Sequence, residues 1–244
     1  MLQAKNISFS YGKKNIFNDI SLSITPGSIT TLIGPSGSGK TTLLRCLALL
    51  AQPQAGEIHV DDDFFSFPWP KEKEFLPPYP KLTTVFQQLF LWPHLTLREN
   101  IMLPDRLRGR DRAEANAQLD EMVEDFEMGE FINRYPNEAS LGQRQRVALA
   151  RALILQPRYL LLDEITSSLD VEQVAKILEC LKKLRDKNIG VFIVTHLLGF
   201  ARHAADQVAF MEGGHIVEDG GPEILRNPQS ERLHDFISVI AAAS

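Results

Sequence analysis

The stretch Gly34-Pro35-Ser36-Gly37-Ser38-Gly39-Lys40-Thr41 decides the fold of this chain, because it fills every fixed position of the phosphate-binding loop pattern G-x-x-x-x-G-K-[ST]. Residues 29–33 before it form a short β-branched, apolar run typical of a strand, and residues 42–50 after it have the composition of a helix. A strand that turns through glycines into a helix presents unpaired backbone N–H groups to an anion. The sequence therefore predicts a nucleoside triphosphatase.

The chemistry of the loop assigns a role to each residue type. Glycines let the backbone close on phosphates, Lys40 supplies a positive charge to the β- and γ-phosphates, and the Thr41 hydroxyl is suited to ligate Mg²⁺. The expected nucleotide-binding residues of this stretch are Gly34, Pro35, Ser36, Gly37, Ser38, Gly39, Lys40, Thr41 and Thr42.

Length and composition indicate one sizeable globular domain, or one domain with a subdomain, since the chain has 244 residues of which 44% are hydrophobic. The net charge of −5 argues against broad attraction to nucleic acid or anionic lipid, although a local basic patch stays open. Cys46 and Cys180 have no C-x-x-C partner, which favours reduced thiols in a cytosolic protein. We find neither a signal peptide nor an apolar run of membrane-spanning length, so we expect any work at a membrane to depend on docking to a partner.

The first third of the chain reads as β-structure around the loop. Residues 2–10 and 17–25 alternate as strands with a turn at 11–15, which predicts an antiparallel sheet. Short strands are expected at 57–60 and 81–86. Between them, residues 64–80 are so rich in proline that we expect an irregular surface excursion, whose aromatic side chains either pack beneath it or serve a partner.

The remainder alternates helices and strands, which predicts an α/β fold with a mostly parallel sheet covered by helices. A mainly helical insert spans residues 96–156, followed by a helix at 171–187 and a hairpin at 207–218. Buried strands are expected at 159–162 and 191–195, the helices of the insert at 97–103, 111–128 and 140–156, and short helices after 222.

A second candidate site is the acid pair Asp163 and Glu164, which an apolar strand delivers at its end. Because side chains alternate along a strand, the two carboxylates should point apart. Asp163 is suited to hold Mg²⁺ beside Thr41, and Glu164 to orient or deprotonate the water that attacks a γ-phosphate. Standing alone, the pair could equally be a turn or a helix cap.

Together these motifs resemble the ATP-binding subunit of ABC transporters over nearly the whole chain. Four further segments carry the resemblance: residues 85–88 resemble the family's Q-loop, 139–148 its signature motif, Ser167-Ser168-Leu169-Asp170 its D-loop, and 195–196 its switch histidine. The resemblance implies a P-loop NTPase fold of the ABC ATPase type in a single domain, 1–244. Its core and antiparallel β subdomain would comprise 1–95 and 157–244, and its helical signature subdomain 96–156.

The resemblance also implies roles for single residues. Tyr11 lies where the family stacks an aromatic ring on adenine, although a tyrosine packed on its own sheet is the alternative. Gln87 resembles the residue that senses Mg²⁺ and the attacking water, and His196 the residue that contacts the γ-phosphate. With Glu164, they make up the expected catalytic set, and Thr41, Gln87 and Asp163 the expected metal set.

The signature stretch supplies a second anion-attracting helix end, because Ser140 is suited to cap the helix that follows it. The resemblance implies that two cassettes pack head to tail, so that Ser140, Gly142 and Gln143 of one close on ATP held by the other. Leu141 departs from the glycine usual in the family, as does Ala139 from leucine. We hypothesise that Leu141 weakens or slows this closure, or that the partner cassette is a different chain. Ile165 and Leu197 are milder departures.

Segments 43–58 and 86–96 look most like bacterial importers of polar amino acids. That resemblance implies transmembrane permease subunits, a second cassette and, indirectly, an extracytoplasmic solute-binding protein as partners, with no nucleic acid, at the inner face of the cell membrane. Trp92 and His94 would then form a permease-docking surface or a clamp inside the helical insert. Other readings are a cassette for lipid, ion or peptide export, a soluble ABC ATPase acting on DNA or ribosomes, and a nucleotide kinase or GTPase.

Overall fold

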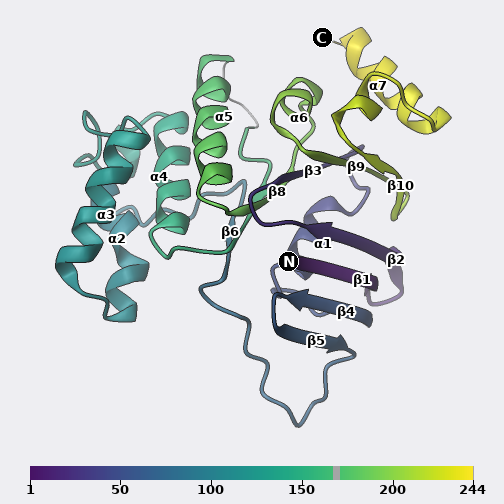
Figure 1. Cartoon of the computed structure of the whole chain (residues 1–244), viewed down its shortest axis with the longest axis horizontal. Coiled ribbons are helices and arrows are strands. Elements are labelled where there is room, and N and C mark those ends of the chain that lie inside the picture. The colour runs from purple at the N-terminus through teal and green to yellow at the C-terminus, as the bar shows by residue number, and fades with distance from the viewer. Residues whose placement is uncertain (167–170, 244) are drawn as a thin grey trace.

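The computed structural model describes residues 1–166 and 171–243, in which two β-sheets enclose the loop helix (Figure 1). The larger sheet has the strand order β10-β9-β3-β8-β7-β6, and the smaller has the order β2-β1-β4-β5. The larger sheet comprises β3 (Ile29–Ile33), β6 (Leu82–Val85), β7 (Tyr159–Asp163), β8 (Gly190–Val194), β9 (Gln207–Glu212) and β10 (His215–Gly220). The smaller comprises β1 (Leu2–Tyr11), β2 (Lys14–Ile24), β4 (Ala55–Val60) and β5 (Asp63–Phe67).

All strands of the larger sheet run parallel except β10, which pairs antiparallel with β9. Its central strands are buried on both faces, which explains their unbroken apolar sequences. On β7, Leu160 and Leu162 face one core, while Tyr159 and Leu161 face another. The strand alternation therefore divides the interior into two cores on opposite faces of one sheet. This confirms the predicted α/β fold and the parallel sheet.

The first core lies beneath the helices of residues 96–156 and beneath α5 (Val171–Asp186), which stand side by side in Figure 1. These helices are α2 (Leu97–Arg108), α3 (Arg112–Asp125), the short 3₁₀ turn Pro136–Glu138 and α4 (Leu141–Leu153). The second core packs α1 (Lys40–Leu47) between the larger sheet and the antiparallel sheet. The loop helix is thus fixed from both sides.

The C-terminal part covers the opposite end of the larger sheet. It contains α6 (Leu198–Ala204), the 3₁₀ turn Pro222–Leu225 and α7 (Glu231–Ala243). Phe236 of α7 packs on Phe210 of β9, with ring centroids 5.1 Å apart. Helical structure is therefore found after residue 222 as expected: the 3₁₀ turn has four residues, and α7 is longer, with 13 residues.

The expectation of an irregular excursion over 64–80 is wrong at its start. Asp63–Phe67 contains no proline and pairs antiparallel with β4 as an edge strand. Phe65 and Phe67 are buried, and Phe65 contacts the rings of Trp69 and Phe75 at 5.7 and 5.8 Å. Packing therefore accounts for most aromatics of this stretch, while Tyr79 remains 57% exposed.

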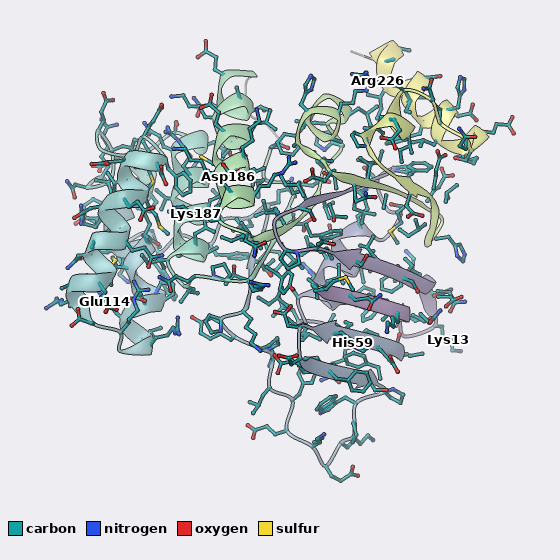
Figure 2. The ribbon with its side chains drawn as sticks, in the orientation of Figure 1. Lys13, His59, Glu114, Asp186, Lys187 and Arg226 are labelled. Atoms are coloured by element: carbon teal, nitrogen blue, oxygen red, sulfur yellow. The ribbon has the colours of Figure 1, made fainter. Side chains whose placement is uncertain are left out.

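The turn between β1 and β2 is shorter than the expected 11–15, since Tyr11 still pairs with Lys14. Charged side chains such as Lys13 in this turn and Glu114 on α3 lie on the periphery (Figure 2). Both cysteines are free and buried, and burial raises the pKa of each thiol to about 12. No helix in the described part of the chain is long and apolar enough to cross a membrane.

Candidate nucleotide-binding site

The loop between β3 and α1 is shaped by Gly34, whose φ of 149° is a conformation that side chains disfavour. A Cβ at this position would overlap the carbonyl oxygen of Met211 on β9 and lie 3.1 Å from its carbonyl carbon. The obstacle is backbone, which cannot rotate aside as a side chain can. Glycine is therefore required here so that the chain can leave β3 between β9 and α1.

Lys40 is the first residue of α1 and is 7% exposed. Its Nζ donates to the carbonyl oxygens of Gly34 and Pro35, both at 2.8 Å. Burial lowers the pKa of Lys40, opposed by the carboxylates of Glu164 and Asp163. The ammonium thus sits inside the loop, and its hydrogen bonds hold the loop closed around it.

A buried hydroxyl at Ser38 tests whether the loop fits a phosphate. Ser38 is 5% exposed, and its Oγ has no hydrogen-bond partner among the described residues. A buried polar atom left in this state costs about 1–3 kcal/mol. Gly39 caps α1 in a left-handed conformation and provides no side-chain cap, so the helix N-terminus keeps unpaired donors. A hydroxyl, an ammonium and free N–H groups converge here, which is the donor set that a polyphosphate requires.

Asp163 and Thr41 bring two oxygen ligands together from positions 122 residues apart, since Thr41 Oγ1 donates to Asp163 Oδ1 at 3.1 Å. Asp163 ends β7 and is 5% exposed. Burial raises the pKa of the Asp163 carboxyl, and the hydrogen bond from Thr41 opposes that rise. A hydroxyl beside a buried carboxylate at a phosphate loop is an oxygen environment suited to Mg²⁺.

Glu164 comes directly after β7, and its backbone no longer has the extended conformation of a strand. Its φ is +50°, and its backbone N–H donates to the carbonyl oxygen of Val194 at 2.9 Å. Among charged groups, Glu164 has the largest effect on the pKa of Lys40, ahead of Asp163. The charges of Lys40, Asp163 and Glu164 are therefore close enough to interact with one another.

The parallel sheet collects the other candidates at the same edge. Gln87 follows β6 and His196 follows β8, each shortly beyond the carboxyl end of its strand, and both side chains are exposed. Gly34 and Glu164 follow β3 and β7 in the same sense. Ligand sites of open parallel sheets lie at this edge. The next residue before His196, Thr195, is fully buried and accepts a hydrogen bond from the N–H of Leu197 at 3.1 Å, which fixes the turn.

Tyr11 and the signature belong to other elements, β1 and α4. Tyr11 ends β1 with half of its surface exposed, and its ring edge contacts Phe9 at 4.9 Å. Ser140 caps α4 as the sequence predicts: its Oγ accepts from the N–H of Gln143 at 3.2 Å, while Gln143 Oε1 accepts from the N–H of Ser140 at 2.9 Å. Gln143 is thus engaged in a capping box, which sequence reasoning missed. The expected D-loop, 167–170, lies outside the described residues.

Segment 92–100 links the Q-loop to the helical part. Asn100 is fully buried, donates to the carbonyl oxygens of Trp92 and Leu95 at 3.1 Å, and accepts from the N–H of Trp92 at 2.7 Å. The Trp92 side chain is nevertheless 51% exposed, with its ring 5.8 Å from that of His94. The backbone is anchored and the ring points outward, so the alternative of a clamp inside the insert is wrong.

Comparison with protein families decides the assignment, since residues 17–167 match the family model described as ABC transporter. The chain belongs to the ABC transporter family. It has the ABC ATPase fold, and its enzymatic activity is that of the family, the hydrolysis of ATP. The nucleotide kinase and GTPase readings are thereby excluded.

Relatives extend the likeness over the whole cassette. The chain is 40% identical to the arginine transport ATP-binding protein ArtM of Bacillus subtilis, with 98% of this chain and 100% of the relative covered. It is 39% identical to the glutamine transport ATP-binding protein GlnQ of Escherichia coli, with 99% and 100% covered. A solved dimer of the ATP-binding cassette MJ0796 bound to ADP and Pi is 30% identical, with a TM-score of 0.77 and coverage of 91% of this chain and 99% of that one.

Proposed function

We propose that this cassette is the ATP-hydrolysing subunit of an importer for polar amino acids. The observation that carries the substrate class is the full-length likeness to arginine and glutamine transport ATP-binding proteins, and to the L-cystine import protein TcyC of Bacillus subtilis at 39% identity. The observations that support the chemistry are the loop residues Lys40 and Thr41, the contact of Thr41 with Asp163 at the end of β7, and the buried Ser38 hydroxyl, which has no hydrogen-bond partner among the described residues.

Bound MgATP supplies the γ-phosphoryl group and the cation that neutralises its charge. Lys40 would exchange its loop carbonyl partners for phosphate oxygens, and the neighbouring oxygens of Thr41 and Asp163 would together hold the Mg²⁺ ion. Glu164, turned away from the strand direction, orients or deprotonates the attacking water, with Gln87 and His196 completing the site from adjacent strand ends. Tyr11 offers its open face for stacking on adenine.

The site is completed by a second cassette in this proposal. Ser140, Gly142 and Gln143 contact the nucleotide held by the partner, because the N-terminus of α4 presents donors to an anion. A solved structural relative is itself a dimer bound to ADP and Pi, which supports this arrangement. ATP binding therefore joins two chains and hydrolysis releases them.

Permease subunits dock at a groove of about 450 Å³ between the two structural parts. Its lining residues include Pro77, Tyr79, Phe86, Arg151 and Leu155. Exposed Trp92 and Tyr79 provide the apolar area that such a contact buries. The cassette lies at the cytoplasmic face of the membrane, bound through the permease and affected only indirectly by a solute-binding protein.

The deciding experiment is Glu164→Gln with saturating MgATP, followed by light scattering. We expect a stable dimer because water is no longer activated while nucleotide binding persists. Glu57→Gln, on β4 of the antiparallel sheet and outside the phosphate loop, serves as the matched control and should cycle normally. A Glu164→Gln protein that stays monomeric at saturating MgATP would contradict the cassette mechanism. Uptake of arginine, glutamine and cystine by vesicles holding the cassette with its permease tests the substrate class.

A further inference from the structure

The side chain of Gln173, on α5, lies against Gly142 of the signature motif. A Cβ on Gly142 would overlap Oε1 of Gln173 and would lie 2.9 Å from its Cδ and 3.1 Å from its Cγ. The amide of Gln173 therefore covers Gly142 in the first turn of α4. Gln173 is half-buried, in the first turn of α5. No motif drew attention to it, because the contact joins residues that are distant in sequence.

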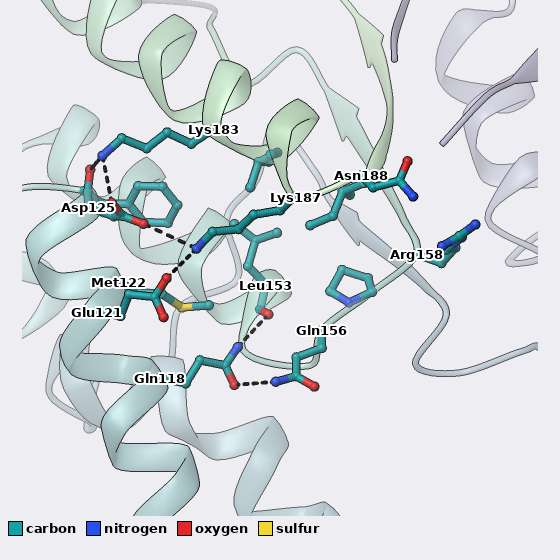
Figure 3. Close-up of a pocket in the computed structure, with 14 residues that line it drawn as sticks. Gln118, Glu121, Met122, Asp125, Leu153, Gln156, Arg158, Lys183, Lys187 and Asn188 are labelled. Atoms are coloured by element: carbon teal, nitrogen blue, oxygen red, sulfur yellow. Dashed lines mark hydrogen bonds and ion pairs between the residues drawn. The ribbon is translucent and has the colours of Figure 1, made fainter. Parts of the chain in front are cut away.

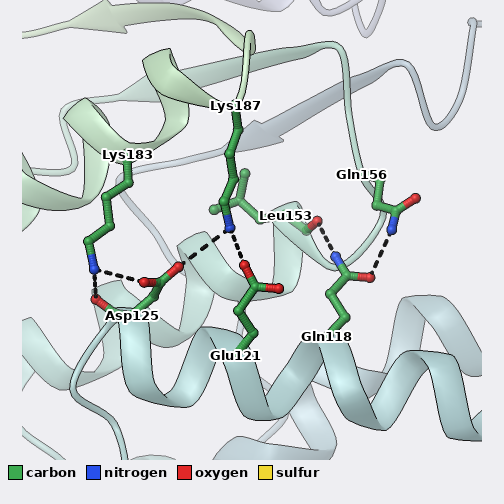
Figure 4. A network of polar contacts seen from close by, with 7 residues as sticks. All are labelled: Gln118, Glu121, Asp125, Leu153, Gln156, Lys183 and Lys187. Carbon is green, nitrogen blue, oxygen red and sulfur yellow. Dashed lines mark hydrogen bonds and ion pairs between the residues drawn. The ribbon is translucent and has the colours of Figure 1, made fainter.

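The same face of α5 is bound to the helical part along its length. Lys183 Nζ lies 2.8 Å from Asp125 Oδ1, and Lys187 Nζ lies 2.6 Å from Glu121 Oε1 (Figure 4). Nearer to Gln173, Lys176 pairs with Glu127 at 2.7 Å. Positions 173, 176, 183 and 187 recur at helical spacing, so they form one stripe. We call these four residues the α5 stripe.

The stripe lies at the surface of the apolar core that α5 shares with the helical part. A cavity of about 510 Å³ separates α3 from the end of α5, with Met122 and Leu184 among its lining residues (Figure 3). Across this cavity the contacts are polar and partly exposed, and each such ion pair contributes little by itself. At the signature end, the amide of Gln173 instead packs directly on backbone. The amide of Gln173 therefore adds a contact at the α4 N-terminus to the apolar packing that α4 and α5 share.

The two side chains of the capping box do not fix the position of α4 relative to α5. Ser140 and Gln143 are hydrogen-bonded to each other, and both belong to α4. They shape the helix end without tying it to the sheet. Among the described residues, Gln173 of α5 makes a contact with this end of α4 from outside the helix.

From this geometry we propose that Gln173 is a positioning residue for the signature: its neutral amide fixes the α4 N-terminus in the place from which it closes on a partner's nucleotide. The proposal rests on the function proposed above for Ser140 and Gly142. Since the amide lies beside the helix end that meets the phosphate, its neutrality matters as much as its volume. A carboxylate of the same size would repel the incoming anion while still suiting the helix end of an isolated chain.

The experiment compares Gln173→Glu and Gln173→Ala in the full chain carrying Glu164→Gln, with MgATP-driven dimerisation measured by analytical ultracentrifugation. We expect Gln173→Glu to weaken the dimer about tenfold at low ionic strength and to recover most of that loss near 0.5 M salt, because salt screens the repulsion. Gln173→Ala should weaken it about fivefold at any salt concentration, as a lost packing contact does. Nucleotide affinity of the monomer and the melting temperature should stay at parent values for both.

Glu172→Gln, an exposed neighbour on the same helix turn, is the matched control and should dimerise like the parent. If the Glu164→Gln parent dimerises and both Gln173 variants dimerise equally well, this inference is wrong, while the proposed function is unaffected. Equal losses for Glu and Ala without any salt dependence would overturn the electrostatic part and leave a packing contact only. A parent that stays monomeric would overturn the proposed function and this inference with it.

Discussion

Replacing Gly34 with alanine should damage the fold far more than replacing Gly37 three residues later. At Gly34 the new Cβ meets the backbone carbonyl of Met211, whereas at Gly37, with φ +80°, a Cβ meets nothing within 4 Å. Both substitutions incur a positive-φ strain of about 1–2 kcal/mol and share the loss of unfolded-state entropy. Only Gly34→Ala adds the cost of overpacking, about 1–3 kcal/mol.

The predicted difference between the two variants is therefore about 1–3 kcal/mol in the free energy of unfolding. Urea denaturation of the nucleotide-free chain measures it directly, and the shared terms cancel in the comparison. Fluorescence-detected ATP binding should show that Gly34→Ala also loses affinity, since the displaced loop can no longer hold Lys40. Unfolding energies that agree within about 0.5 kcal/mol would refute the role assigned to the Met211 carbonyl.

Three further outcomes follow from the site and its surroundings. Asp163→Asn should raise the melting temperature of the nucleotide-free chain at pH 7. The reason is that the pKa of Asp163 is raised in the folded chain, so its carboxylate destabilises the fold once the pH exceeds that pKa. Thermal unfolding at pH 3 should show no gain, and Mg²⁺-dependent nucleotide binding should be lost. Asp105→Ala should cost about 3 kcal/mol in urea unfolding, since it removes the buried acid of the 3.2 Å ion pair with Arg110 and leaves that arginine its hydrogen bond to Gln118 alone among side chains that the structure describes. Asp120→Ala, at an exposed pair, should cost under about 1 kcal/mol, and equal costs would contradict the burial argument. Leu141→Gly should raise ATPase turnover and ATP-driven dimerisation, and unchanged values for both would reject the hypothesis that this leucine impedes closure.

The fold could be predicted where a local pattern fixes the answer. The glycine loop, the apolar strands and the proline-terminated helices carry their structure in neighbouring residues, and the Ser140 cap was read from residue type alone. The predicted closeness of Thr41 and Asp163 is confirmed by their 3.1 Å hydrogen bond, because a parallel sheet brings strand ends to one edge.

What sequence could not supply depends on contacts between distant residues. The strand at Asp63–Phe67 exists because β4 offers it a pairing edge, and proline density nearby concealed it. The turn at Glu164 depends on the Val194 carbonyl, and the contact of Gln173 with Gly142 spans two helices. A contact between a side chain and the backbone of a distant residue produces no periodic pattern in the sequence, so it could not be predicted.

The two buried thiols have a practical consequence for measuring subdomain motion. Cys46 on α1 and Cys180 on α5 are at most 4% exposed, and a thiol with a pKa near 12 carries almost no thiolate at neutral pH. Maleimide dyes should therefore not react with either native cysteine. Exposed positions such as Glu114 on α3 and Lys13 beside β1 can be exchanged for cysteine in the otherwise unaltered chain, which makes a donor and acceptor pair available for single-molecule distance recordings during ATP turnover.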